Sequence, residues 1–176
     1  MTSADPSLTR DGSSFGINLS YKTQEKPNGI AESFILADDF IGRSDSTLIL
    51  GTAPLSVLGH PQELHKRGVR GVVNMCYEYA GPQADYAALG INQLRLPTVD
   101  HFEPSLSDLK TAVRFINGYK QRGERCYVHC KAGHGRAAAV ALRWIMTQQP
   151  ERDAKDINQS LRSKRKVRKM LWEQAN

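Results

Sequence analysis

The fold is decided by one short stretch of sequence, Val128-His129-Cys130-Lys131-Ala132-Gly133-His134-Gly135-Arg136. It continues a short apolar run, residues 126–129, that is typical of a buried strand, and it ends where a second apolar run predicts a helix over residues 136–148. When a strand enters a helix through a loop of small residues, the loop amides and the helix N-terminus point at one place and favour an anion there. The stretch therefore predicts an α/β unit with an anion site at its turn.

Strands and helices alternate on the N-terminal side of this stretch as well. The sequence predicts further strands at residues 47–50, 69–75 and 91–96, and helices at residues 60–67, 83–89 and 105–122. The last of these helices is expected to begin at Ser105 as its cap and to bury one apolar face, formed by Leu106, Leu109, Val113 and Ile116. Alternation at this pitch predicts one α/β domain with a central, mainly parallel sheet flanked by helices.

The length and composition suit a single domain. The chain has 176 residues, with 24 basic against 18 acidic side chains and a net charge of +6, which favours anionic partners. Residues 1–30 are polar and rich in Ser, Gly and Pro, so we predict a flexible N-terminal arm there and a folded domain over residues 31–176. A helical, basic tail is predicted from residue 151.

Two broad classes of protein are disfavoured. The longest apolar stretch, residues 137–146, contains Arg143 and is about half as long as a bilayer requires, so no transmembrane helix is predicted. The three cysteines, Cys76, Cys126 and Cys130, are odd in number and unevenly spaced, which suits neither a disulfide framework nor a paired zinc site. A reducing, intracellular compartment fits them better.

Cys130 is the candidate nucleophile. The loop amides, the helix dipole and Arg136 all favour its thiolate over its thiol, and a thiolate that faces a bound phosphate can attack phosphorus. The planar guanidinium of Arg136 could hold two phosphate oxygens. His129 is expected to order the loop by hydrogen bonding. Substrate contacts are expected from the five residues between nucleophile and arginine, Lys131, Ala132, Gly133, His134 and Gly135.

The pattern of His129-Cys130, five residues and Arg136 resembles the signature of the Cys-dependent protein tyrosine phosphatase superfamily, and the chain length resembles its dual-specificity branch. Within that branch the chain looks most like the mitochondrial PTP-like phosphatases that act on phosphatidylglycerophosphate, in residues 68–75, 94–100 and 127–133. The resemblance covers about residues 48–146. It implies a phosphatase domain, a cysteinyl-phosphate intermediate, and neither a metal nor a cofactor.

A general acid must protonate the leaving oxygen. Asp100 follows a predicted strand, so in a parallel sheet it lies at the same edge as Cys130, and the resemblance places the family's acid in this loop. Glu103 is the nearest rival, although it sits closer to the next helix. Glu78 and Tyr79 resemble an acidic and aromatic loop that lines the pocket in the lipid-directed subfamily; a surface turn is the alternative.

Three features bear on the substrate. Ala137 stands where such phosphatases usually carry Ser or Thr, and loss of one donor slows a step by about 10²–10³; we therefore expect breakdown of the intermediate to limit turnover. Lys131 and His134 resemble the loop residues of phosphoinositide phosphatases and favour an anionic lipid headgroup. Residues 162–169 hold six basic residues in eight, which favours contact with an anionic membrane. A solvated helix face is the alternative for this tail, and nucleic acid is disfavoured because aromatics are not interleaved.

The predicted function is hydrolysis of a phosphomonoester of an anionic phospholipid, phosphatidylglycerophosphate first, within lipid metabolism. We expect an intracellular protein, mitochondrial or cytoplasmic, associated with a membrane. Two alternatives stay open: a dual-specificity phosphatase acting on phosphoprotein at Tyr, Ser or Thr, and a phosphate-binding pseudophosphatase, which Ala137 suggests. A glucan phosphatase is disfavoured because aromatics make up only 7% of the residues and offer no carbohydrate platform.

Overall fold

A computed structural model describes residues 47–168, 170 and 171. Most of the folded domain predicted for residues 31–176 lies within these residues, whereas the predicted N-terminal arm, residues 1–30, lies outside them. The described residues form a parallel sheet of four strands, in the order β1-β4-β2-β3, with five α-helices and one 3-10 helix around it. The predicted fold class, a single α/β domain with a central parallel sheet, is confirmed.

The predicted strands and helices up to residue 148 follow one another along the chain with ends that differ by at most two residues, whereas the short η4 was not predicted. The elements are β1 (Leu48–Gly51), η4 (Ser56–Leu58), α1 (His60–Lys66), β2 (Val69–Cys76), α2 (Gln83–Ala88), β3 (Asn92–Thr98), α3 (Leu106–Gln121), β4 (Arg125–His129), α4 (Arg136–Gln148) and α5 (Ala154–Lys164).

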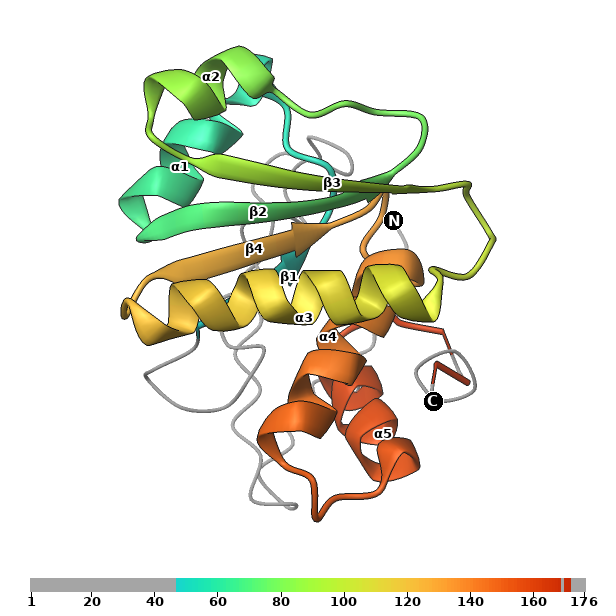
Figure 1. The fold of residues 1–176 in the computed structure, drawn as a ribbon. Helices are drawn as coiled ribbons and strands as arrows, with labels where there is room; N and C mark the ends of the chain where they lie inside the picture. The colour runs from blue at the N-terminus through green and yellow to red at the C-terminus, as the bar shows by residue number, and fades with distance from the viewer. Residues whose placement is uncertain (1–46, 169, 172–176) are drawn as a thin grey trace, which may run out of the picture.

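The sheet separates two hydrophobic cores. On one face α3 and α4 pack against the strands and α5 packs against α4, and together they form the larger core, around side chains such as Ile116, Leu142 and Ile157 (Figure 1). On the other face α1 and α2 cover a smaller core that includes Leu64 and Tyr86. Because both faces of the sheet are covered, its central strands are buried along their length, as the unbroken apolar runs in the sequence indicated.

All four strands end at the same edge, which is the right-hand edge in Figure 1. Gly51 and Asn74 both pair with His129, and Cys76 pairs with Thr98, so the loops that follow these strands are neighbours. The side chains predicted to take part in chemistry all follow a strand of this edge.

The long helix α3 confirms most of one prediction and corrects part of it. Ser105 caps the helix, with its hydroxyl oxygen accepting a hydrogen bond from the amide of Asp108 at 3.0 Å. Leu109, Val113 and Ile116 are buried, but Leu106, which was predicted to join them, is 42% exposed. Leu106 is the first residue of the helix, at the open edge of the sheet, where the core no longer covers it.

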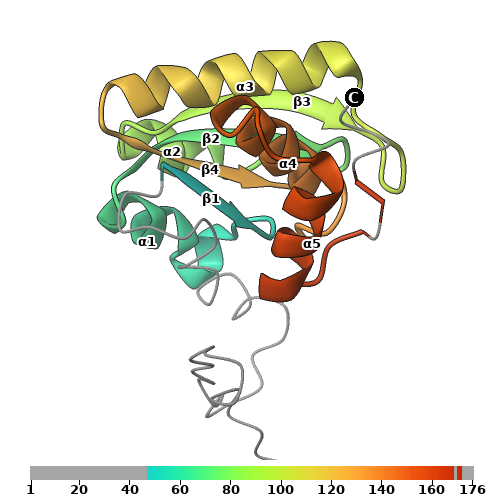
Figure 2. The ribbon, with the colours of Figure 1, turned by 90° about the horizontal axis from the view of Figure 1, so that it is seen from below.

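The prediction of a helical tail is wrong for residues 165–168, 170 and 171, whereas residues 169 and 172–176 lie outside the described residues. Helix α5 ends at Lys164, and Arg165 is fully extended. Residues 165–168 then cross beside the loop that follows β4, where the amide of Arg168 donates to the carbonyl oxygen of His134 at 2.9 Å (Figure 2). Val167 and Leu171 are buried in the larger core while Met170 is exposed. Burial of these two side chains favours the extended path over continuation of the helix.

Two glycines of the domain should respond in opposite ways to substitution by alanine. A Cβ at Gly71, on β2, would lie 2.5 Å from the Tyr119 ring. That ring is buried and contacts Phe115 and Arg122, which leaves it little room to retreat. We expect Gly71→Ala to lower the free energy of unfolding by about 1–3 kcal/mol. Gly118, inside α3, has room for a Cβ, and Gly118→Ala should raise it by about 0.4–1 kcal/mol. Urea unfolding of both variants checks this, and a stable Gly71→Ala protein would contradict the described packing.

Candidate active site

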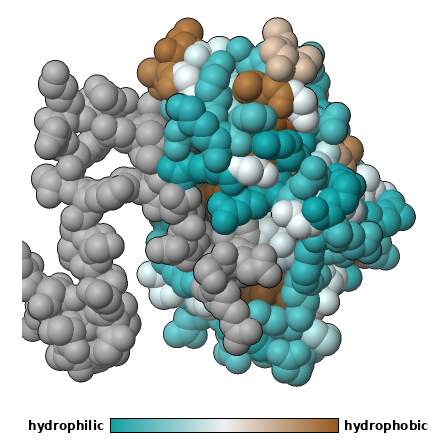
Figure 3. Space-filling model, turned by 90° about the vertical axis from the view of Figure 1, so that its left-hand side faces the viewer, coloured by the Kyte–Doolittle hydropathy of each residue, from teal (hydrophilic) through white to brown (hydrophobic). Residues whose placement is uncertain are grey.

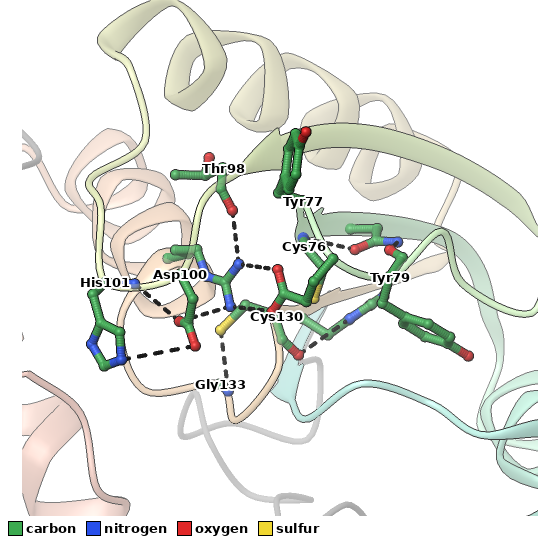
Figure 4. A network of polar contacts seen from close by, with 12 residues as sticks. Cys76, Tyr77, Tyr79, Thr98, Asp100, His101, Cys130 and Gly133 are labelled. Carbon is green, nitrogen blue, oxygen red and sulfur yellow. Dashed lines mark hydrogen bonds and ion pairs between the residues drawn. The ribbon is translucent and has the colours of Figure 1, made fainter.

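The loop that follows β4, residues 130–136, is called the catalytic loop below. Cys130 is its first residue and is almost fully buried. The sulfur of Cys130 accepts a hydrogen bond from the amide of Gly133 at 3.2 Å, so the loop folds back over this sulfur (Figure 4). Gly133 has a φ of 71°, a left-handed conformation that favours glycine. Arg136, the last residue of the loop, is the first residue of α4.

The guanidinium of Arg136 is the centre of the polar network in Figure 4. Its side chain is 1% exposed. Nη1 and Nη2 each donate to one oxygen of the Glu78 carboxylate at 2.8 Å. Nη1 also donates to the carbonyl oxygen of Thr98 at 2.7 Å, and Nη2 lies 2.9 Å from Oδ1 of Asp100. The hydrogen bonds to Arg136 lower the pKa of Glu78 to about 2 and raise the pKa of Arg136, so both groups are charged at neutral pH.

The structure brings the three predicted catalytic residues together. Asp100 follows β3 and is half exposed; it reaches the same guanidinium as Glu78, and its carboxylate also accepts a hydrogen bond from the amide of His101 at 3.0 Å. His101 has a φ of 67°, an uncommon conformation for this residue type, at the turn that carries Asp100. The chemical roles of Cys130, Arg136 and Asp100 stay predictions.

Glu78 and Tyr79 both lie in the loop after β2, but they serve different contacts. Glu78 holds Arg136, as described above. Tyr79 points away from the guanidinium, and its hydroxyl donates to the carbonyl oxygen of Pro54 at 2.6 Å. The backbone carbonyl oxygen of Tyr79 accepts a hydrogen bond from the side-chain amide of Asn74 at 2.9 Å. Tyr79 thus anchors the loop to its neighbours, and direct contact of Glu78 or Tyr79 with substrate stays a prediction.

Burial suppresses the charge of two groups beside Cys130. Burial raises the pKa of Cys76 to about 12, and burial lowers the pKa of His129 to about 3. His129 is therefore neutral; it stacks on Tyr127, and its Nδ1 lies 3.4 Å from the carbonyl oxygen of Cys130. These contacts suit the predicted role of His129 in ordering the loop, and its low pKa does not suit proton transfer near pH 7.

The positive charge around the catalytic loop has a different origin from the one expected. Burial and the nearby Arg165 and Lys166 lower the pKa of His134, so His134 contributes little charge at neutral pH. Lys131 is exposed. Arg165 and Lys166 belong to the C-terminal segment that crosses the loop. They contribute positive charge beside the loop, although the sequence predicts them as part of a separate basic tail.

Several contacts of the site were not predicted. The carbonyl oxygen of Thr98 holds Arg136, and Arg165 donates to the carbonyl oxygen of Ala132 in the catalytic loop and to that of Leu50 on β1. Contacts to backbone oxygens leave no signature in residue type. The sequence signal for close contacts on this loop is its two glycines, Gly133 and Gly135. A Cβ at Gly133 would lie 2.6 Å from the side chain of Arg165, and a Cβ at Gly135 would lie 2.6 Å from the side chain of Arg168.

Residues 47–168, 170 and 171 contain no group of three His, Cys, Asp or Glu side chains placed to hold a metal ion. Over the same residues, each helix is too short or too polar to cross a bilayer.

Comparison with known proteins gives a curated relative for most of the described domain. The chain is 37% identical over 114 residues to human "Phosphatidylglycerophosphatase and protein-tyrosine phosphatase 1", an alignment that covers 61% of this chain and 56% of the human protein. The chain therefore spans little more than half the length of that relative. Among solved structures it resembles PTPMT1 in complex with PI(5)P, with a TM-score of 0.63, 29% identity, and coverage of 73% of this chain and 87% of that one.

The N-terminal part of the chain resembles a different family. The nucleotidyl transferase family matches residues 3–62, and a glucose-1-phosphate thymidylyltransferase from Neisseria meningitidis is 48% identical over 44 residues, which cover 25% of this chain and 15% of that enzyme. Most of residues 3–62 lie outside the described residues. The dual specificity phosphatase catalytic domain family matches residues 48–174, which include the whole described sheet and site. The chain belongs to this family of dual specificity phosphatase catalytic domains.

Proposed function

We propose that the protein is a Cys-dependent phosphomonoester hydrolase that acts on an anionic phospholipid, with phosphatidylglycerophosphate as the first candidate. The observation that carries the proposal is the catalytic loop itself. The Cys130 sulfur faces the Gly133 amide, and the same loop delivers Arg136 to a position fixed by Glu78 and Thr98. A phosphoryl group placed there would meet a nucleophile, a fixed cation and main-chain donors.

The reaction takes two steps. In the first, the Cys130 thiolate forms an S–P bond, the P–O bond to the leaving group breaks, and Asp100 gives its proton to the leaving oxygen. In the second, Asp100 takes a proton from water as the water oxygen attacks phosphorus, the S–P bond breaks, and inorganic phosphate leaves with the thiolate restored. Atoms and charge balance without another reactant.

The contacts of Arg136 couple substrate binding to the acid. Its guanidinium donates hydrogen bonds to both Glu78 carboxylate oxygens and to the Thr98 carbonyl oxygen, and its Nη2 forms an ion pair with the Asp100 carboxylate. Glu78 is bidentate and the Thr98 oxygen belongs to the backbone, so Asp100 is the partner that a phosphoryl oxygen displaces most readily. Displacement releases the Asp100 carboxyl toward the leaving oxygen.

Two lines of support favour a lipid substrate. The human relative carries phosphatidylglycerophosphatase in its name, and the similar PTPMT1 structure holds a phosphoinositide. Lys131 and Lys166 are exposed beside the catalytic loop and suit a headgroup with more than one negative charge. A phosphoprotein substrate is the second candidate, because the same human relative is also named a protein-tyrosine phosphatase.

Substrate preference is tested by phosphate release. The full-length protein should release phosphate faster from vesicles that contain phosphatidylglycerophosphate than from phosphotyrosine or phosphothreonine peptides at equal phosphate concentration. Cys130→Ser should abolish release from both, because serine is a far poorer nucleophile at neutral pH. Faster release from the peptides would contradict the lipid substrate and favour a protein phosphatase. Activity that survives Cys130→Ser would refute the mechanism.

Glu78→Gln should weaken the hold on Arg136. The substitution keeps the shape but removes the charge that makes both hydrogen bonds strong, so kcat/KM at pH 7 should fall about tenfold or more. Glu63→Gln is a matched control, because Glu63 on α1 is also 37% exposed and pairs at 2.9 Å with Arg67, the residue that follows α1, away from the site. The control should leave kcat/KM unchanged.

The same pair predicts a dependence of stability on pH. The pKa of Glu78 lies below its ordinary value, at about 2, so the pair stabilises the fold fully above about pH 4.5 and loses this effect as the pH falls toward 2. Thermal unfolding from pH 7 to pH 2 should therefore show wild type and Glu78→Gln converging in acid. A constant difference in Tm over this range would contradict the ion pair.

We further propose that the protein binds the surface of an anionic intracellular membrane through the edge that carries the site. Exposed apolar residues gather on the loop between β3 and α3 at this edge, with Val99 48%, Phe102 67% and Leu106 42% exposed. The exposed Lys131 and Lys166 lie beside the neighbouring catalytic loop. Figure 3 shows the opposite end of the molecule, which is mostly hydrophilic, with hydrophobic residues in small separate groups.

Membrane contact can be measured without catalysis. Cys130→Ser protein should sediment with vesicles of phosphatidylcholine and phosphatidylglycerol, and much less with phosphatidylcholine alone. Adding Phe102→Ser should lower this partition about tenfold, because a Phe side chain no longer leaves water. Adding Val57→Ser should not change it, since Val57 is even more exposed but lies on η4, next to α1. Equal binding to both kinds of vesicle, or no effect of Phe102→Ser, would overturn the membrane proposal and leave the chemistry untouched.

A further inference from the structure

The outer side of the catalytic loop is bound to the rest of the domain through its carbonyl oxygens. The carbonyl of Lys131 accepts from the amide of Ala53 at 3.2 Å. The carbonyl of Ala132 accepts from Nη2 of Arg165 at 3.2 Å, and the carbonyl of His134 accepts from the amide of Arg168 at 2.9 Å. Two of these three donors belong to the C-terminal segment, residues 165–168.

One peptide unit of the loop is held from both sides. The C=O of Ala132 and the N–H of Gly133 belong to the same planar trans peptide, in which the two groups point in opposite directions. The C=O accepts from Arg165, and the N–H donates to the Cys130 sulfur at 3.2 Å. A donor that fixes the carbonyl outward therefore fixes the amide inward, toward the nucleophile.

Arg165 is well placed to impose this orientation. Its Nη1 donates to the carbonyl oxygen of Leu50 at 2.7 Å, so the guanidinium joins β1 to the catalytic loop. The contact is close: a Cβ at Gly133 would lie 2.6 Å from Nη2 of Arg165 and 2.5 Å from the carbonyl oxygen of Gly51. Arg165 is half-buried, and burial lowers its pKa while Tyr127 and Cys130 oppose that shift, so it remains a cation near the sulfur.

We propose that Arg165 is a positioning residue of this site: by holding the carbonyls of Leu50 and Ala132, it turns the Gly133 amide onto the Cys130 sulfur and stabilises the thiolate. The inference rests on the proposed function, in which that thiolate is the nucleophile. Arg165 acts through the loop peptide and touches no reacting atom. The C-terminal segment is thus part of the active site, although it follows the catalytic cysteine by 35 residues.

A lysine cannot replace this contact. The two carbonyl oxygens lie on separate segments and are reached by different nitrogens of one rigid, planar group. An ammonium group keeps the charge but offers its donors from a single atom, so it cannot hold both oxygens in the same geometry. Arg165→Lys therefore separates the effect of orientation from the effect of charge.

The test compares Arg165→Lys and Arg165→Met with Arg162→Met, a control in which an exposed arginine on α5 is removed. The first readout is the rate at which iodoacetamide alkylates Cys130 as the pH is raised, located by mass spectrometry. Both Arg165 variants should react about tenfold to a hundredfold more slowly near pH 7 and recover at higher pH, because a hydrogen bond to a charged group is lost. Arg162→Met should match the wild type.

The other groups that interact with the Cys130 charge stay in place in these variants. They are Cys76 on β2, Tyr127 on β4 and Arg136 on α4. A shifted alkylation profile is therefore attributable to Arg165. The second readout is hydrolysis of a soluble aryl phosphate, for which kcat should fall with the alkylation rate while KM changes less.

The outcomes separate the two proposals. If the Arg165 variants lose thermal stability but keep the wild-type alkylation profile, Arg165 is only structural and the inference is wrong. If the profile moves in Arg165→Met but not in Arg165→Lys, charge alone suffices and positioning is refuted. If the profile moves in both, while Cys130→Ser still hydrolyses substrate, the inference about the sulfur stands and the proposed function fails.

Discussion

A buried cation that needs fixed partners holds this site together. The Arg136 side chain has almost no contact with water, and an unpaired charge in that position would be very costly. Its partners come from the ends of two strands: Glu78 after β2, and Thr98 with Asp100 at and after β3. They can meet at one point only because parallel strands end at the same edge of the sheet. The ion pairs and hydrogen bonds of Arg136 therefore depend on the parallel arrangement of the strands.

The catalytic loop has two sides with different partners. Its inner side presents an amide to the Cys130 sulfur, while its outer carbonyls are held by Ala53 and by the C-terminal segment, residues 165–168. Because each peptide unit has a donor and an acceptor that point in opposite directions, neither side can be arranged without the other.

Local pattern in the sequence predicts much of this arrangement. Hydrophobic periodicity and the glycines and prolines that end each element predict the strands and α-helices to within a few residues. The positions of Cys130, Asp100 and Arg136 after predicted parallel strands are enough to predict that they meet at one edge. What local pattern misses depends on distant backbone. Arg165 reads as one basic residue among many in residues 162–169, since nothing in a charge run says which member will meet a carbonyl group 115 residues earlier. The prediction that Leu106 is buried is wrong for a related reason. Periodicity indicates which face of a helix is apolar, but not where the sheet beneath the helix ends.

The alanine at position 137 makes the contacts of the C-terminal segment, residues 165–168, more important for stabilising the Cys130 thiolate. Ala137 is fully buried in the first turn of α4, and the residues after it, Ala138 and Ala139, bring no hydroxyl group to the loop either. In the mechanism that we propose, the departing thiolate is then stabilised by other groups when the phosphoryl intermediate breaks down. In the described part of the chain, the hydrogen bond to the Cys130 sulfur comes from the Gly133 amide, whose peptide is oriented by Arg165. An enzyme without the usual hydroxyl donor depends more strongly on that amide and on the cation behind it.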